Sequence, residues 1–216
     1  MTDEQLIGDA QDELLWEPRV DNRAIAVTAQ DGVVTLRGTV GSFRERREAA
    51  GAVKRVYGTK RVENELEVRL LNGDRRDDAD LRGDVLQALM LDALVPSSVD
   101  AKVADGVVTL TGTTSYQFVR DEAEFVAGNV PGVVWIDDVI ELTPPAPSAG
   151  DVQHSIKKAM KRDAKLDAEG IRVESHNGTV QLSGNVRSWA EHDAAVNAAW
   201  AAPGVSDVDD RLFVAY

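Results

Sequence analysis

The sequence of 216 residues contains no cysteine, and this absence excludes disulfide bonds, thiolate metal ligands and thiol nucleophiles. Aromatic residues make up only 5% of the chain, and histidine occurs only three times. No apolar run approaches the roughly 18 residues that a membrane-spanning helix requires. The first residues are acidic and lack the basic head and apolar stretch of a secretory signal, so the sequence predicts a cytoplasmic protein.

Basic residues are also scarce: 24 of them stand against 37 acidic residues, which gives a formal net charge of −13. This balance excludes a protein that coats nucleic acid through general basic charge. The acidic excess is concentrated in residues 73–147, which contain 5 basic and 14 acidic side chains. Hydrophobic residues at 43% and charged residues at 28% are close to the averages of globular proteins, so we expect the chain to fold.

Three similar segments recur along the chain: DGVVTLRGTV at 31–40, DGVVTLTGTT at 105–114 and NGTVQLSGNV at 177–186. The spacings of 74 and 72 residues between them hold for three sets of glycines and for many apolar positions. We therefore predict three repeats, residues 1–72, 73–147 and 148–216. The glycines related in this way are Gly32, Gly106 and Gly178, then Gly38, Gly112 and Gly184, then Gly58, Gly132 and Gly204.

Each repeat shows the same order of periodicities. An amphipathic helical segment comes first, and two short alternating runs follow, joined by Asp-Gly or Asn-Gly, the dipeptides typical of a β-hairpin turn. A second helix and a last alternating strand complete the repeat. Ser42 and Ser188 are the expected caps of the second helices, with Glu45 and Glu191 completing a capping box. The proline-rich stretch 144–150 is expected to be a short, stiff spacer.

These patterns predict an α+β protein built from three tandem αββαβ units. Each unit is expected to hold a small three-stranded mixed sheet, covered on one side by two helices. The two strands that a helix connects should be parallel, beside the antiparallel hairpin.

No catalytic, metal or cofactor site is predicted. The glycines do not form either phosphate-binding pattern, Gly-x-Gly-x-x-Gly or Gly-x-x-x-x-Gly-Lys-(Ser/Thr), between a strand and a helix, so we interpret all nine as turns or helix ends. The histidines His154, His176 and His192 lack the i, i+4 spacing of a helical metal site and are expected at the surface or at caps. Trp16, Trp135, Trp189 and Trp200 are expected to be buried.

A basic helix face in the third repeat is the candidate binding site. At helical spacing its cations fall opposite the apolar residues Val152, Ile156 and Met160. Such a face could bind phosphate head groups, or it could be an ordinary solvated helix side. The same two interpretations apply to a second basic cluster, Arg44, Arg46, Arg47, Lys54, Arg55, Lys60 and Arg61. The residues predicted to bind a lipid or partner are Lys157, Lys158, Lys161, Arg162 and Lys165.

The repeat resembles the BON domain, a module named after bacterial osmotically induced and nodulation proteins. The resemblance rests on the αββαβ order, the DGVVTLxG hairpin, and the PGV or GTKRV element ahead of the last strand. It covers nearly the whole chain, and the segments 187–191 and 200–205 are similar to soluble multi-BON proteins of the osmotically induced type. The resemblance implies a non-catalytic module of envelope or osmotic stress, with binding to anionic phospholipid and, in some cytoplasmic relatives, to potassium.

Two functional hypotheses follow. The first is a non-enzymatic, stress-associated binding or scaffold protein that engages an anionic membrane surface or a protein partner through repeated weak sites. The alternative is a cytoplasmic protein that binds or senses potassium in the osmotic response. No nucleic-acid partner is expected, and the oligomeric state is left open.

Overall fold

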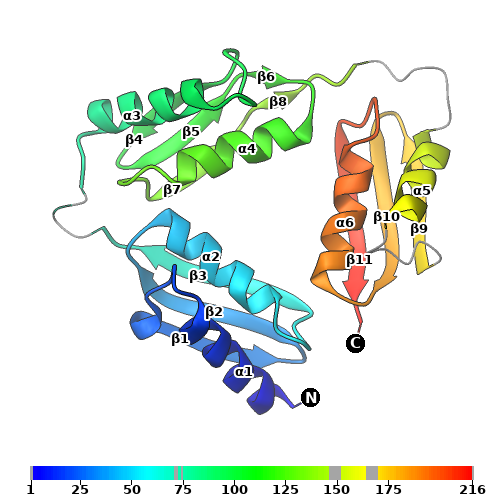
Figure 1. Ribbon diagram of the computed structural model, residues 1–216, viewed down its shortest axis with the longest axis horizontal. Coiled ribbons are helices and arrows are strands. Elements are labelled where there is room, and N and C mark those ends of the chain that lie inside the picture. The colour runs from blue at the N-terminus through cyan, green and yellow to red at the C-terminus, as the bar shows by residue number, and fades with distance from the viewer. Residues whose placement is uncertain (1, 71–72, 74, 146–151, 164–169, 216) are drawn as a thin grey trace. The chain divides into compact units, whose positions relative to one another are not determined.

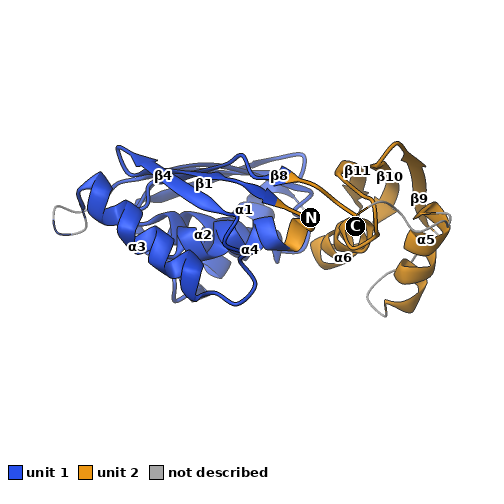
Figure 2. Cartoon of the chain, turned by 90° about the horizontal axis from the view of Figure 1, so that it is seen from above, with its two compact units in different colours: residues 1–113, 119–141 blue, residues 114–118, 142–216 orange. Residues whose placement is uncertain are grey.

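The computed structural model describes residues 2–70, 73, 75–145, 152–163 and 170–215 (Figure 1). Contacts divide the chain into two compact units, residues 1–113 with 119–141 and residues 114–118 with 142–216 (Figure 2). The first unit contains the first repeat and most of the second. The spacer predicted at 144–150 lies mostly outside the described residues.

The first repeat has the predicted αββαβ order. Its central strand pairs antiparallel with the strand before it and parallel with the strand after the second helix. The two helices pack on one face of this sheet. The elements are α1 (Asp3–Trp16), β1 (Ile25–Gln30), β2 (Val33–Val40), α2 (Phe43–Lys54) and β3 (Arg61–Val68).

The third repeat has the same topology as the first, and the second repeat differs from it in one respect. In the second repeat a two-stranded pair, β6 (Thr113–Thr114) with β8 (Glu141–Leu142), follows the three-stranded sheet as a separate piece. The other elements of the second repeat are α3 (Asp78–Leu91), β4 (Asp100–Ala104), β5 (Val107–Thr111), α4 (Gln117–Gly128) and β7 (Trp135–Asp138). Those of the third are α5 (Val152–Arg162), β9 (Ile171–His176), β10 (Thr179–Val186), α6 (Trp189–Trp200) and β11 (Asp207–Val214).

The hairpin turns have the backbone geometry that their sequences indicate. Asp31 and Gly32 have φ angles of 53° and 83°, and the matching Asp105 and Asn177 lie at 52° and 48°. A two-residue turn with both φ angles positive matches the right-handed twist of the paired strands. The φ angle is also positive at every glycine interpreted above as a turn or helix end: Gly32, Gly38, Gly58, Gly106, Gly112, Gly132, Gly178, Gly184 and Gly204.

The core of each repeat lies between the sheet and its two helices. In β2, Val34 and Leu36 are fully buried under α1 and α2, while the alternate residue Arg37 points to the open face and pairs with Glu65 of β3. The alternation follows from the two-residue period of a strand, which places successive side chains on opposite faces. The open face is therefore polar and the helical face supplies the hydrophobic stabilisation.

Two second helices begin at the predicted serines. The Ser42 and Ser188 hydroxyls accept hydrogen bonds from the backbone N–H groups of Glu45 and Glu191. The glutamate carboxylates do not reach back to the serine N–H, as a strict capping box requires. They accept instead from the N–H groups of Gly41 and Arg187, one residue earlier.

Candidate functional site

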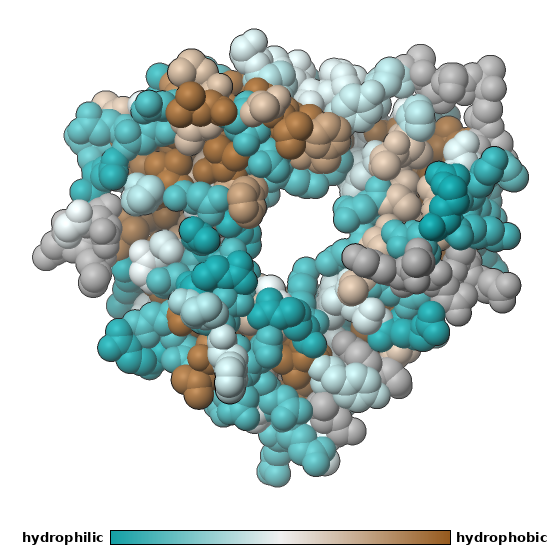
Figure 3. All heavy atoms as spheres, viewed as in Figure 1, coloured by the Kyte–Doolittle hydropathy of each residue, from teal (hydrophilic) through white to brown (hydrophobic). Residues whose placement is uncertain are grey.

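Helix α5 presents the predicted basic face to solvent. Ile156 and Met160 are buried against the sheet of the third repeat, because residues four apart lie on one side of a helix. The cations on the opposite side are exposed, and Figure 3 shows hydrophilic side chains over the visible side of this helix. Those exposed residues are Lys157, Lys158, Lys161 and Arg162. Lys165 lies outside the described residues.

These four cations are unpaired within the part of the chain that the structure describes. Among the residues that the structure describes, none of the four forms an ion pair with a carboxylate. Within α5 itself there is no acidic side chain at all. The cationic face is therefore available to bind an external anion. An internal salt bridge would compete with that binding.

The equivalent helices of the other two repeats carry the opposite charge. Helix α1 has five acidic side chains and no basic one, and α3 has three acidic side chains and a single arginine, Arg82. Because α1, α3 and α5 occupy the same place in the αββαβ order, the shared fold does not require a basic helix there. The charge of α5 is a property of the third repeat alone.

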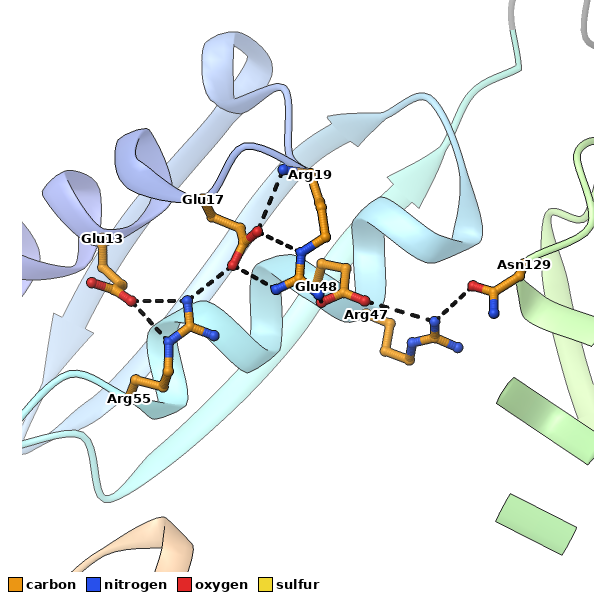
Figure 4. Close-up of polar contacts among 7 residues, drawn as sticks. All are labelled: Glu13, Glu17, Arg19, Arg47, Glu48, Arg55 and Asn129. Atoms are coloured by element: carbon orange, nitrogen blue, oxygen red, sulfur yellow. Dashed lines mark hydrogen bonds and ion pairs between the residues drawn. The ribbon is translucent and has the colours of Figure 1, made fainter. Parts of the chain in front are cut away.

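The second basic cluster behaves differently, because three of its arginines, Arg46, Arg47 and Arg55, make contacts within the structure. Arg55, which directly follows α2, binds Glu13 and Glu17 at 2.9 and 3.0 Å, and Arg19 binds Glu17 and Glu48 at 2.6 and 2.8 Å (Figure 4). The Glu17 side chain is buried, and its hydrogen bond with Arg19 outweighs the effect of burial and lowers its pKa to about 2. This network joins the end of α1 to α2.

Two further arginines of this cluster face the second repeat within the first unit. The guanidinium of Arg46 lies 4.4 Å from the ring centre of Trp135, and that of Arg47 lies 4.4 Å from that of Phe125. Arg47 also donates to Asn129 Oδ1 at 2.9 Å (Figure 4). Burial lowers the pKa of both arginines, yet a guanidinium remains charged at physiological pH. These two cations connect the first repeat to the second. They are therefore not free to bind an external anion.

One histidine is not the surface or capping residue that we predicted. His154 and His176 are exposed, whereas the side chain of His192 on α6 is only 13% exposed. Its Nε2 lies 2.7 Å from Asp210 Oδ2, its Nδ1 lies 3.0 Å from Asp193 Oδ1, and its ring is 4.7 Å from that of Trp189. The prediction failed because spacing within one helix cannot show that this side of α6 faces β11.

The tryptophan prediction was also wrong at Trp16, which is 83% exposed. The buried residues of α1 are Leu6, Ala10 and Leu14, and a residue two positions after Leu14 points away from that side of the helix. Trp135 is 40% exposed, while Trp189 and Trp200 pack at the edge of the core of the third repeat.

Within the described part of the chain, no three His, Cys, Asp or Glu side chains gather to hold a metal ion. The described helices also include none that is both long and apolar enough to cross a membrane. A groove in the first unit is lined by Arg23, Arg44 and Arg69. Two of these are already paired, Arg23 with Asp21 and Arg69 with Glu67.

The repeat topology and its turns are those of a known module. The model of the BON domain matches residues 2–69, 77–144 and 148–216. The chain belongs to the BON domain family. Its three repeats are three BON domains, called first, second and third below.

A relative of the chain is "Osmotically-inducible protein Y" of Escherichia coli (strain K12), which is 32% identical over 148 residues. The matched part is 65% of this chain and 74% of that relative. Two solved chains of CdsD, a structural protein of the type III secretion system of Chlamydia trachomatis, are 14% and 13% identical. They cover 96% and 100% of this chain, and 91% and 100% of their own, with TM-scores of 0.26 and 0.27, which are too low to support a structural comparison.

Proposed function

We propose that this protein is a non-enzymatic binding protein of the osmotic-stress response, and that its third BON domain attaches it to anionic phospholipid. The observation that carries the proposal is the cationic face of α5, whose four described cations are exposed and have no ion-pair partner among the described residues. The family membership and the osmotically inducible relative support the stress association.

The electrostatics explain why such a face matters on a chain of net charge −13. An anionic membrane repels the chain as a whole, but salt screens charges beyond roughly 10 Å, so the side chains nearest the surface dominate the interaction. Each lysine or arginine near an anionic surface contributes about 1 kcal/mol. Lys157, Lys158, Lys161 and Arg162 together are therefore sufficient for reversible binding, which weakens as salt rises.

The test is co-sedimentation with vesicles. We expect the protein to pellet with phosphatidylcholine vesicles that contain about 30% phosphatidylglycerol and to stay in solution with phosphatidylcholine alone. Replacing Lys157, Lys158, Lys161 and Arg162 with glutamine should weaken binding at least tenfold, because about 1.4 kcal/mol corresponds to a factor of ten. Equal absence from both pellets would refute the proposal.

A matched control separates the α5 face from the total charge. The control variant also loses four positive charges, but from exposed positions in the first two domains. Its substitutions are Arg23→Gln, Arg61→Gln, Arg69→Gln and Lys102→Gln. We expect it to bind vesicles nearly as the parent does. A loss as large as that of the α5 variant would show that overall charge, and not this helix, governs attachment.

The potassium hypothesis stays a prediction, because sites built from backbone carbonyl oxygens have no mark in the sequence. If the folded protein binds potassium, its melting temperature should be higher in potassium chloride than in sodium chloride of equal ionic strength. Equal melting temperatures would contradict it.

A further inference from the structure

The same contact between the second helix and the last strand recurs in all three BON domains, and we call it the helix–strand clamp. It joins residues 46 and 64 in the first domain, 120 and 138 in the second, and 192 and 210 in the third. These positions are related by the 74- and 72-residue spacings of the repeat. In each domain the strand residue also accepts the N–H two residues later through its side-chain oxygen: Asn64 from Leu66, Asp138 from Ile140, and Asp210 from Leu212.

In the first two domains the helix contributes an arginine to the clamp. Arg46 donates to the carbonyl oxygens of Asn64 and Leu66 at 2.8 and 2.9 Å. Arg120 donates to Asp138 Oδ2 at 2.9 Å. Since an arginine keeps its proton throughout the physiological pH range, these two clamps do not respond to pH.

The third domain has a histidine where the others have arginine. Both ring nitrogens of His192 lie within hydrogen-bond distance of a carboxylate oxygen, at 2.7 Å for Asp210 and 3.0 Å for Asp193. An ionised carboxylate can only accept, so both contacts are made only when both nitrogens carry protons. The geometry of the clamp therefore fits the imidazolium cation and loses a donor when the ring becomes neutral.

We propose that the His192 clamp is a pH-sensitive switch that binds α6 to β11 when His192 is protonated and loosens the third BON domain when it is not. Unlike the attachment proposed above, this switch does not depend on any ligand.

The two carboxylates in contact with His192 favour the charged ring. Asp193 comes from α6 itself and Asp210 from β11, while the nearby Asp209 of β11 is occupied by Gln181 and Arg211. Strand β10 contains no titratable side chain. Asp163, which directly follows α5, lines the same groove as Asp193.

The direction of the pH response follows from these contacts. Burial alone would lower the pKa of His192, but the hydrogen bonds and charges of Asp193 and Asp210 outweigh burial and raise it above the ordinary value. A group whose pKa is higher in the folded than in the unfolded chain stabilises the fold fully below the unfolded value, about 6.5. That stabilisation is lost as pH rises through the folded value, so the third domain should open more readily in mildly alkaline solution.

The test uses the full chain and two observables. The ring signals of His192, followed by NMR, should titrate with a pKa above about 6.5. After correction for intrinsic exchange, hydrogen-exchange protection of α6 and β11 should be severalfold greater at about pH 6 than at about pH 8. Protection of α4 and β7 should change much less, because the clamp of the second domain is Arg120 with Asp138.

Two variants isolate the switch from a general loss of structure. His192→Arg places in the third domain the residue that the other two clamps use, and should remove the pH dependence while keeping protection high. His192→Gln should also remove the pH dependence, but its hydrogen-exchange protection of α6 and β11 should stay at the lower level that the parent shows at high pH. A His192 pKa at or below the ordinary value, or an unchanged pH dependence in His192→Arg, would overturn the proposal.

Discussion

Replacing Gly38 with alanine is expected to unfold the first BON domain. Gly38 lies in β2 with a φ of 125°, a backbone region that residues with a side chain rarely adopt. A Cβ atom at this position would lie 1.9 Å from the carbonyl oxygen of Ala24, far inside van der Waals contact. Ala24 directly precedes Ile25, which pairs with Gly38, so its carbonyl cannot move away without breaking the start of the ladder, and we expect a loss of about 3 kcal/mol or more.

That loss is comparable to the whole stability of a domain of this size, which rarely exceeds about 3–5 kcal/mol. Hydrogen exchange of the β1–β2–β3 sheet should therefore show loss of protection in the Gly38→Ala variant, while the sheet of the third domain stays protected. The equivalent glycines are under the same constraint: a Cβ atom would lie 2.1 Å from Ser98 O at Gly112 and 2.1 Å from Gly170 O at Gly184.

Gly51 gives the matched control, because it lies in the helix α2 of the same domain and a Cβ there meets no atom within 4 Å. Gly51→Ala should stabilise the domain by up to about 1 kcal/mol, since alanine favours the helix more than glycine does. If Gly38→Ala were as stable as Gly51→Ala, that result would contradict the close contact between residue 38 and the carbonyl oxygen of Ala24.

The second large effect is expected at Phe43, the first residue of α2. This residue is only 6% exposed, yet it belongs to the core cluster of the second domain and not to that of its own domain. It lies edge-on to Trp135, with ring centroids 6.0 Å apart, and a Cβ at Gly128 would come within 2.8 Å of it. Phe43 is thus the apolar anchor between the first and second domains, beside the Arg46 and Arg47 contacts.

We expect Phe43→Ala to cost about 3 kcal/mol, near the lower end for a buried phenylalanine because its cavity opens between two domains. Calorimetry should show the first and second domains melting together in the parent and separately in the variant. Fluorine NMR of fluorotryptophan-labelled protein should show a shifted Trp135 signal.

Phe213 supplies the control for this experiment, since it is 69% exposed in the third domain. Phe213→Ala should change stability by no more than about 0.5 kcal/mol. A Phe43→Ala variant that melts like the parent would contradict the anchoring role.

The repeat and its fold could be predicted because they rest on local signals. Asp31-Gly32 and its two equivalents favour a tight turn through their own backbone preferences. The helical spacing of Val152, Ile156 and Met160 likewise places one side of α5 against a sheet. The position of the α5 cations followed from the same period. Such features depend on residues close in sequence, so a single chain reveals them.

The roles of individual polar residues could not be predicted in this way. Arg46, Arg55 and Lys157 are alike in the sequence, but Arg46 binds a strand and a neighbouring ring, Arg55 binds Glu13 and Glu17, and Lys157 faces solvent. One signal for His192 was present and unused: the repeat spacings align it with Arg46 and Arg120, and Asp210 with Asn64 and Asp138.

By itself, the sequence determined a threefold αββαβ chain, its hairpin turns and the cationic side of one helix, because backbone preference and hydrophobic period act within a few residues. Only the tertiary structure decided which charges are paired, that Phe43 packs in the core of the next domain, and that His192 lies between two carboxylates. The deciding contacts join residues far apart in the chain, such as His192 with Asp210 and Phe43 with Trp135, and burial then sets the strength of each contact.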